Sequence, residues 1–525
     1  MAFDPVELQI LWSRLIHVTE EAWQTIWRAS FSTVIGEALD FGVELLDADG
    51  NSLAHAPHSM PVFHFCLPAT VRALLERFPP DTLEPGDVLV TNDPWLCAGH
   101  LPDIATVSPI FRGGRPVAYV ASVGNAADIG GTLESARAME VYEEGICLPP
   151  LKGWRGYRPV PEVREILAAN VRHPEMVLGD LDAQVAANRV AEERVTAFLD
   201  EYDLPDLEAL SAAVRARSED AVRRAVAEVP DGTYPASTWV DGVDEPLRLG
   251  VEVDVHGDEM SVRYVDVPDQ LPRGGTNCTR LYTVSHTLYA LKLLLIPEVP
   301  SNAGNFAPFD VSVREGSILA ARRPASVALR TRTGWHLHEL LFSALAPAMP
   351  DRVQAGSGLA CLLTASGRRP DGRAFSDHLF LAGGQGASAG VDGRAALIFP
   401  TSAGNTSIEM LEQRSPVVVE HKGYAEGSAG DGASRGGEGE RFAMRALDDD
   451  GISVQVSVLP EGLRAAPPGL LGGGSGAPAR LFVDGTELPE GGLIDLGDGA
   501  LLEVHMPGGG GYGARPAGDD DNEGT

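Results

Sequence analysis

The sequence has few cysteines and almost no lysine. The five cysteines are far apart and form no Cys-x-x-Cys pair: Cys66, Cys97, Cys147, Cys278 and Cys361. Such a set argues against a disulfide framework and a structural zinc knot, and it favours a reducing, cytoplasmic environment. Only three lysines occur among 41 basic residues, and none follows a glycine. The chain therefore has no Gly-x-x-x-x-Gly-Lys-Ser/Thr phosphate loop, and we expect any ATP to bind another chain.

Long apolar runs and net positive charge are also missing. No stretch approaches a membrane-spanning length of about eighteen apolar residues, and no basic segment followed by an apolar run opens the sequence. The formal net charge of −33 would repel nucleic acid and anionic membranes, so neither is an expected partner. With 44% hydrophobic and 22% charged residues over 525 positions, the composition is that of a globular protein with several packed units.

Hydrophobic periodicity predicts a mixed α/β chain. Asp4, Pro5 and Glu7 form a helix-start signal before an amphipathic helix over about 5–30. Two alternating runs around residues 48–50 predict a hairpin. Further helices and strands are expected in the segments that follow: helices at 67–78, 179–202, 206–229 and 282–296, and strands at 86–91, 105–111, 117–124, 248–257 and 259–267.

We therefore expect a multi-domain α+β fold with long helices and mostly antiparallel or mixed sheets. Turn signals and composition shifts divide the chain into four predicted parts: an N-terminal α/β domain at 1–229, a central mixed α/β domain at 230–440, a strand-rich segment at 441–516, and a disordered acidic tail at 517–525.

Two familiar motifs match only formally. The run GASAG at 386–390 fits the nucleophile elbow, but a strand-like segment follows Ser388 where that motif needs a helix. The run GGGGYG at 508–513 fits a dinucleotide-binding loop, yet the sequence after it cannot open a helix. Tight backbone packing is the better interpretation of these glycines.

Acidic and imidazole groups in the first 140 residues form the candidate catalytic site. Asp40 lies at a helix-to-strand junction, His100 and Asp103 lie three positions apart on a turn, and Asp128 stands before two glycines. Carboxylates with an imidazole suit a Zn, Mn or Fe centre that lowers the pKa of a bound water. The alternative is purely structural, because aspartates cap turns and a His-x-x-Asp pair often closes a loop.

The sequence resembles the hydantoinase B/5-oxoprolinase family in the same order from about residue 4 to 513. The segments that carry the resemblance are DPVELQILWSRL, IGEALDFGVELLDADGNSLAHAP, GDVLVTNDPWLCAGHLPDIATVSPIF, NAADIGG, VYEEGICLPP, NVRHPEMVLGDLDAQVAAN, PSNAGNFAPFDV, RGGEGER and MPGGGGYG.

The resemblance implies a division of labour between two subunits. An A-type subunit with an actin-like ATPase fold uses ATP to phosphorylate the amide or enol, and the B-type subunit then completes hydrolysis or carboxylation at a divalent metal. The chain would thus form a hetero-oligomer. By the resemblance, metal ligands fall at Asp40, His100 and Asp103, with a further histidine opening a His-His-Ala-Asp run. Glu143 and Glu144 would lie near a substrate channel.

This sequence departs from the family pattern at that run, which reads Asn125-Ala126-Ala127-Asp128. Asn125 is the remaining candidate for the fourth ligand, but a neutral amide oxygen binds Zn or Mn more weakly than imidazole. Cys97 stands where the family usually has glycine, and its thiol could replace the lost ligand or act as a nucleophile. The alternative is that Cys97 is a small buried hydrophobe.

Three functions are compatible with this pattern. The first is the B-type subunit of an ATP-dependent hydrolase of hydantoins, oxoprolines or lactams. The second is a subunit of an ATP-dependent ketone carboxylase of the acetone or acetophenone type. The third is a metal-depleted scaffold subunit without catalysis of its own. The sequence does not identify the substrate, which would be a small amide or ketone.

Overall fold

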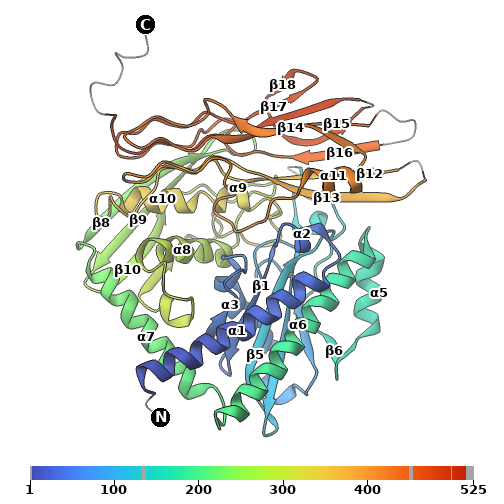
Figure 1. The fold of residues 1–525 in the computed structure, drawn as a ribbon, viewed down its shortest axis with the longest axis vertical. Helices are drawn as coiled ribbons and strands as arrows, with labels where there is room; N and C mark the ends of the chain where they lie inside the picture. Colours follow the sequence, from blue (N-terminus) through green and yellow to red (C-terminus); the bar gives the residue numbers. More distant parts are fainter. Residues whose placement is uncertain (1–2, 133–136, 370, 448–452, 498, 516–525) are drawn as a thin grey trace. The chain divides into compact units, whose positions relative to one another are not determined.

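The computed structural model describes residues 3–132, 137–369, 371–447, 453–497 and 499–515 (Figure 1). The chain forms two compact units, each built from segments far apart in sequence: unit 1 from 1–233, 253–334 and 401–404, and unit 2 from 234–252, 335–400 and 405–525. The predicted mixed α/β class is confirmed. The predicted linear boundaries after 229 and 440 do not coincide with these discontinuous units, and the predicted tail at 517–525 lies outside the described residues.

A seven-stranded antiparallel sheet organises unit 1, in the order β2-β1-β5-β4-β3-β6-β7. Its strands are β1 (Phe41–Asp47), β2 (Ser52–His55), β3 (Val88–Thr91), β4 (Asp103–Arg112), β5 (Arg115–Asn125), β6 (Leu151–Arg155) and β7 (Arg158–Pro159). The hairpin predicted around residues 48–50 is the β1–β2 pair. The strands expected at 105–111 and 117–124 are β4 and β5.

Long helices pack on this sheet. Helix α1 (Pro5–Ala29) begins as predicted, because Asp4 and Glu7 form a capping box around Pro5. Its apolar face lies against the sheet, and the Trp12 indole nitrogen donates to the Leu53 carbonyl at 2.9 Å. Helix α6 (Pro174–Glu201) runs beside α1 (Figure 1), and α7 (Glu208–Ala227) follows it. Both were expected from their helical periodicity.

Shorter elements complete the described part of residues 1–334, which includes segments of both units. Helices α3 (Phe63–Arg77) and α8 (Arg280–Leu295) pack together, and the remaining helices are α2 (Thr33–Gly36), α4 (Val141–Glu144), α5 (Pro161–Asn170) and α9 (Thr331–Gly334), with 3-10 turns at Pro80–Thr82 and Ala303–Phe306. A four-stranded sheet has the order β11-β10-β9-β8, formed by β8 (Gly232–Val240), β9 (Leu247–His256), β10 (Glu259–Val265) and β11 (Phe309–Ser312).

Two further sheets make the core of unit 2. One has the order β13-β12-β16-β19, formed by β12 (Cys361–Arg368), β13 (Ala374–Leu381), β16 (Ser453–Val458) and β19 (Gly492–Leu496). The other has the order β14-β15-β20-β17-β18, formed by β14 (Val417–Ala425), β15 (Gly439–Ala446), β17 (Arg480–Val483), β18 (Thr486–Leu488) and β20 (Leu501–His505). Their inward side chains share one apolar cluster, as in a β-sandwich. Helices α10 (Leu337–Leu345) and α11 (Ile408–Arg414) also belong to this unit.

The glycine run at 508–513 is a backbone-packing element. Gly509 donates to the Gly437 carbonyl at 2.9 Å, Gly437 donates to the Gln385 carbonyl at 2.8 Å, and a Cβ on Gly509 would lie 2.0 Å from that same Gln385 oxygen. Residues 506–515 contain no helical turn, so the run itself does not open a helix as a dinucleotide-binding loop would, and the backbone contacts support tight packing. Ser388 lies in short β-bridges with Gln354 and Val391, which is not a strand-to-helix elbow.

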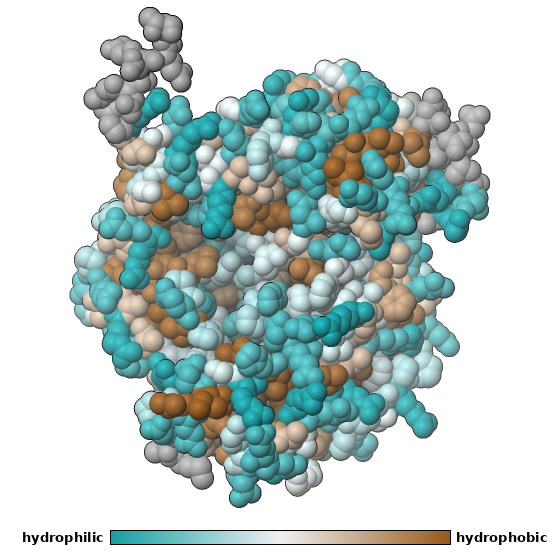
Figure 2. Space-filling view, viewed as in Figure 1, coloured by the Kyte–Doolittle hydropathy of each residue, from teal (hydrophilic) through white to brown (hydrophobic). Residues whose placement is uncertain are grey.

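The described surface is largely hydrophilic on the face shown in Figure 2. A hydrophobic patch at the lower left lies over the N-terminal end of α1, where Val6 and Ile10 are exposed (Figure 2). Within the described ranges, no helix has the length and apolar character needed to cross a bilayer.

Replacing Gly509 with alanine should unfold unit 2 at lower denaturant concentration. The added Cβ would overlap the Gln385 carbonyl, and we expect a loss of about 1–3 kcal/mol in the free energy of unfolding. Gly497→Ala is the matched control, because nothing lies within 4 Å of its Cβ position. Urea denaturation of both variants measures the difference. Equal midpoints would contradict the packing role of Gly509.

Candidate functional site

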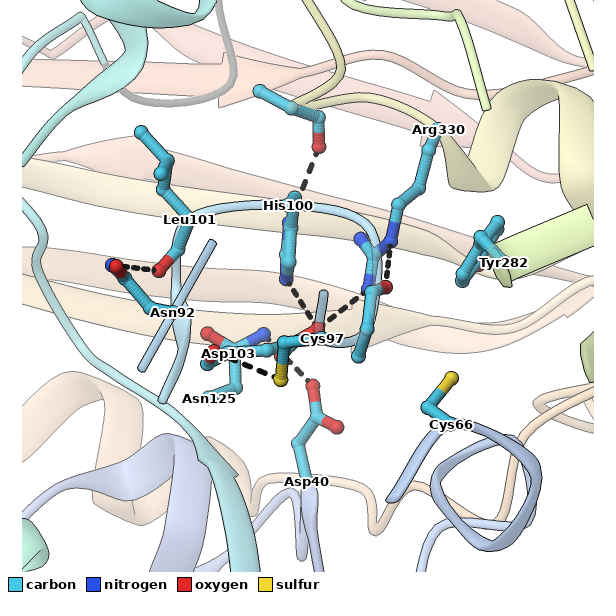
Figure 3. Close-up of polar contacts among 12 residues, drawn as sticks. Asp40, Cys66, Asn92, Cys97, His100, Leu101, Asp103, Asn125, Tyr282 and Arg330 are labelled. Carbon is cyan, nitrogen blue, oxygen red and sulfur yellow. Dashed lines mark hydrogen bonds and ion pairs between the residues drawn. The ribbon is translucent and has the colours of Figure 1, made fainter. Parts of the chain in front are cut away.

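Three neighbouring strands bring the predicted residues to one edge of the unit 1 sheet. Figure 3 shows the side chains of Asp40, His100, Asp103 and Asn125 close together. Asp40 directly precedes β1, Asn125 ends β5, and Asp103 begins β4. Asp103 and Asn125 are register partners, and Phe41 pairs with Gly124. Because β1, β5 and β4 are adjacent and antiparallel, residues 40, 125 and 103 follow one another across the sheet.

Asp40 is buried and bonded to Asn125. The Asn125 side-chain nitrogen donates to Asp40 Oδ2 at 3.0 Å, and the Asn125 backbone nitrogen donates to the Asp40 carbonyl at 3.0 Å. Burial and the charge of Asp103 raise the pKa of Asp40 to about 7, against the opposing effects of the Asn125 hydrogen bond and of Arg330. This carboxyl group can therefore gain or lose a proton near neutral pH.

A tight loop before β4 presents His100. Asn92 holds the loop by donating to the Leu101 carbonyl at 2.7 Å. The His100 Nε2 atom lies 3.1 Å from Asp103 Oδ2, and Nδ1 lies 3.4 Å from the Ala328 carbonyl. Burial and the charge of Arg330 lower the pKa of His100, so its imidazole is neutral at physiological pH.

Arg330 is a site residue that sequence reasoning missed. Its Nη2 atom lies 2.7 Å from Asp103 Oδ2, its Nε atom donates to the Ala98 carbonyl at 2.7 Å, and its guanidinium carbon lies 4.4 Å from the centre of the Tyr282 ring (Figure 3). The Arg330 residue is only 5% exposed and Asp103 only 1%. Since 227 positions separate the partners, no local pattern could have paired them.

Glu144 fixes the segment that carries Arg330. Its Oε1 atom accepts hydrogen bonds from the backbone nitrogens of Val327 and Ala328 at 2.8 and 2.9 Å. Burial raises the pKa of Glu144 to about 7, although these two hydrogen bonds oppose the shift. Glu143 instead accepts from the backbone nitrogen of Glu140 at the start of α4. In the described contacts, both glutamates support local structure.

Both carboxylate oxygens of Asp128 accept hydrogen bonds from residues outside the candidate site. Its Oδ1 atom accepts from the Gly130 backbone nitrogen at 3.0 Å and from Arg172 Nη1 at 2.8 Å, and its Oδ2 atom accepts from the backbone nitrogens of Arg172 and His173. These contacts fix the turn before α6. They do not support the catalytic role predicted for Asp128, because both oxygens are already used structurally.

Cys97 behaves as a small buried group. Its thiol donates to the Asp103 backbone carbonyl at 3.6 Å, and burial raises the pKa of Cys97 well above its usual value. A thiol held in its neutral form is a poor ligand and a poor nucleophile. The geometry favours the hydrophobic interpretation of Cys97 over the two chemical ones.

The donor set does not fit a divalent metal well. Among the described residues, no group of three or more His, Cys, Asp or Glu side chains is arranged to hold a metal ion. Arg330 already neutralises Asp103, and Asn125 offers Asp40 a hydrogen-bond donor. A +2 ion placed about 4 Å from a guanidinium would be repelled by roughly 8 kcal/mol at an effective dielectric constant of about 20.

A late segment of the chain supports the turn before Asp40. The Gly404 backbone nitrogen donates to the Ala38 carbonyl at 2.8 Å, and a Cβ on Gly404 would lie 2.1 Å from the Glu37 carbonyl. Leu39 in this turn has a positive φ of 58°. Residues 401–404 belong to unit 1, so this contact lies within the unit that holds the site.

Two buried carboxyl groups and an imidazole at one edge of an antiparallel sheet make a site whose side chains can transfer protons. The hydantoinase B/oxoprolinase family matches residues 4–515, and the chain belongs to this family. The B-type subunit of a putative D-/L-hydantoinase from Pseudomonas sp. (strain NS671) is 28% identical, over 97% of this chain and 90% of that protein. The 5-oxoprolinase PfmaA of Pestalotiopsis fici is 29% identical, but this chain spans only 42% of its length.

Solved structures show the same fold. The ATP-dependent caprolactamase from Pseudomonas jessenii superposes with a TM-score of 0.90 at 25% identity, covering 98% of this chain and 92% of that chain. A nucleotide-free acetone carboxylase superposes with a TM-score of 0.87 at 18% identity, covering 97% and 76%. The expected relation to both the hydrolases and the carboxylases is thus confirmed at the level of the fold.

Replacing Glu144 with glutamine should change how stability depends on pH. The pKa of Glu144 rises from 4.5 to about 7 on folding, so its stabilisation is complete below about pH 4.5 and is lost as pH rises through 7. Glutamine keeps an acceptor for Val327 and Ala328 without titrating. We expect the variant to match the wild type near pH 4.5 and to gain up to about 3 kcal/mol relative to it at pH 8. Urea unfolding across this range tests the claim, and parallel curves would contradict it.

Proposed function

We propose that this chain is the B-type subunit of an ATP-dependent hydrolase of cyclic amides, acting with a separate ATP-binding A-type subunit. The observation that carries the proposal is the meeting of Asp40, His100 and Asp103 at one sheet edge in a chain of this family. The names of two bacterial relatives, the B-type subunit of a hydantoinase and the beta subunit of a caprolactamase, support a subunit role.

The expected division of labour follows from what the sequence lacks. Since no lysine follows a glycine, the chain has no phosphate loop of the common type, and ATP would be used by the partner to activate the amide. Ring opening at this site then needs a group that takes a proton from the attacking water. Asp40, with its pKa raised to about 7, is suited to that task, and the neutral His100 beside Asp103 is the second candidate.

Ring opening by the assembled complex is the direct test. The chain is co-expressed with its A-type partner and incubated with MgATP and hydantoin, 5-oxoproline or caprolactam, and the linear product is measured by mass spectrometry. We expect product only when ATP and both subunits are present. No product from any of these rings, and from other small lactams, would contradict the proposal.

Asp40→Asn separates chemistry from assembly. Loss of the titrating carboxyl group should lower turnover at least about 100-fold while leaving the complex with the partner intact. Asp81→Asn, at an exposed position of the same unit, is the matched control and should keep full turnover. Equal rates in both variants would remove Asp40 from the chemistry.

The other two functions predict different results in the same assay. A ketone carboxylase would fix labelled bicarbonate into acetone or acetophenone in the presence of ATP and would leave lactams intact. A scaffold subunit would support turnover equally well with Asp40 and His100 replaced. Either result would replace the hydrolase proposal.

A further inference from the structure

The buried guanidinium of Arg330 is fixed from three sides. It pairs with Asp103 Oδ2 at 2.7 Å, donates through Nε to the Ala98 carbonyl at 2.7 Å, and lies over the Tyr282 ring at 4.4 Å. The Ala98 carbonyl oxygen and the face of the Tyr282 ring both carry partial negative charge, so they attract the guanidinium as the Asp103 carboxylate does. The surroundings therefore form a site for one permanent cation, supplied by the chain itself.

The Arg330 guanidinium binds the same carboxylate that a divalent metal at this site would need as a ligand. Asp103 Oδ2, which accepts from Arg330, is the oxygen that lies 3.1 Å from His100 Nε2 (Figure 3). A divalent ion shared by His100 and Asp103 would have to bind the other oxygen of the same carboxylate, Oδ1, which is buried and has no hydrogen-bond partner among the described residues, while Oδ2 stays paired with Arg330. The guanidinium and the ion would then compete for one carboxylate.

The charges of the neighbouring groups favour a guanidinium over a divalent metal beside Asp103. Two carboxylates and one neutral imidazole would offer a metal two negative charges, but Arg330 cancels that of Asp103. The remaining carboxylate, Asp40, already accepts a hydrogen bond from Asn125. An arginine side chain stays protonated at every accessible pH, so the compensation is permanent.

We propose that Arg330 is the built-in cation of this site, that it takes the place of the divalent metal expected from the family resemblance, and that the chain therefore binds no Zn²⁺ or Mn²⁺ there. Arg330 is a positioning residue in this scheme. It holds the Asp103 carboxylate beside His100, and Glu144 holds the segment from which Arg330 extends.

Metal binding to purified variants tests this proposal. The wild type, Arg330→Lys and Arg330→Gln are each titrated with ZnCl₂ and MnCl₂ by calorimetry, and bound metal is counted by mass spectrometry after dialysis. We expect the wild type and Arg330→Lys to retain less than about one-tenth of an equivalent. Arg330→Gln should bind Zn²⁺ at least about 100-fold more tightly, because removing the guanidinium frees Asp103.

A second substitution locates any metal that is gained. Adding His100→Ala to Arg330→Gln should abolish the new binding, because the imidazole would be its nitrogen ligand. The proposal is overturned if the wild type or Arg330→Lys holds about one equivalent that His100→Ala removes. It is also overturned if folded Arg330→Gln binds no more metal than the wild type.

A variant that leaves Arg330 in place decides the matter if Arg330→Gln does not fold. Asn125→His with Ala126→His restores the two histidines of the family pattern. With the guanidinium still present, we expect no stoichiometric metal, and about one equivalent would contradict the proposal.

These titrations use neither ATP nor the partner. The inference concerns the same site as the proposed function, but a failed hydrolysis assay would leave it standing. Equally, a metal bound by the wild type would not exclude cyclic-amide hydrolysis.

Discussion

The buried ion pair between Arg330 and Asp103 is the interaction on which the candidate site depends. A buried charge without a partner is strongly unfavourable, so each of these residues requires the other to be in place. Asp103 is the first residue of β4. Arg330 lies at the end of the segment 327–330, and this segment contacts His100 and Glu144. The geometry around His100 is thus set jointly by the sheet and by a segment more than 200 residues later.

The sheet supplies the other half of that geometry. In an antiparallel sheet, the end of one strand lies beside the start of the next, so a polar residue at each of these ends is carried to the same edge. Asp40, Asn125 and Asp103 occupy such positions on β1, β5 and β4. Burial then changes their chemistry, because a low-dielectric environment raises the pKa of Asp40 and lowers that of His100.

Local signals in the sequence predicted much of this structure. The capping box at Asp4 and Glu7 and the hairpin at 48–50 depend on neighbouring residues, and both are present. Asp40, His100 and Asp103 were predicted as one site because chemistry and family resemblance pointed to the same positions, and the structure brings the three residues together. Arg330 escaped notice, since a buried arginine has no periodic or spacing signature of its own. The linear domain boundaries differ from the compact units for a similar reason: contacts between distant segments, such as 401–404 in unit 1, are invisible to composition.

The hydrogen bond from Gly404 to Ala38 has a consequence for how the protein is made. During translation, β1, β4 and β5 leave the ribosome long before residue 330, so a nascent chain carries Asp103 before its arginine partner has been made. The turn before Asp40 gains its last support only when residue 404 has emerged. The site is therefore completed late in synthesis. Prematurely terminated chains would contain its aspartates and histidine but lack the Arg330 ion pair and the Gly404 hydrogen bond that position them.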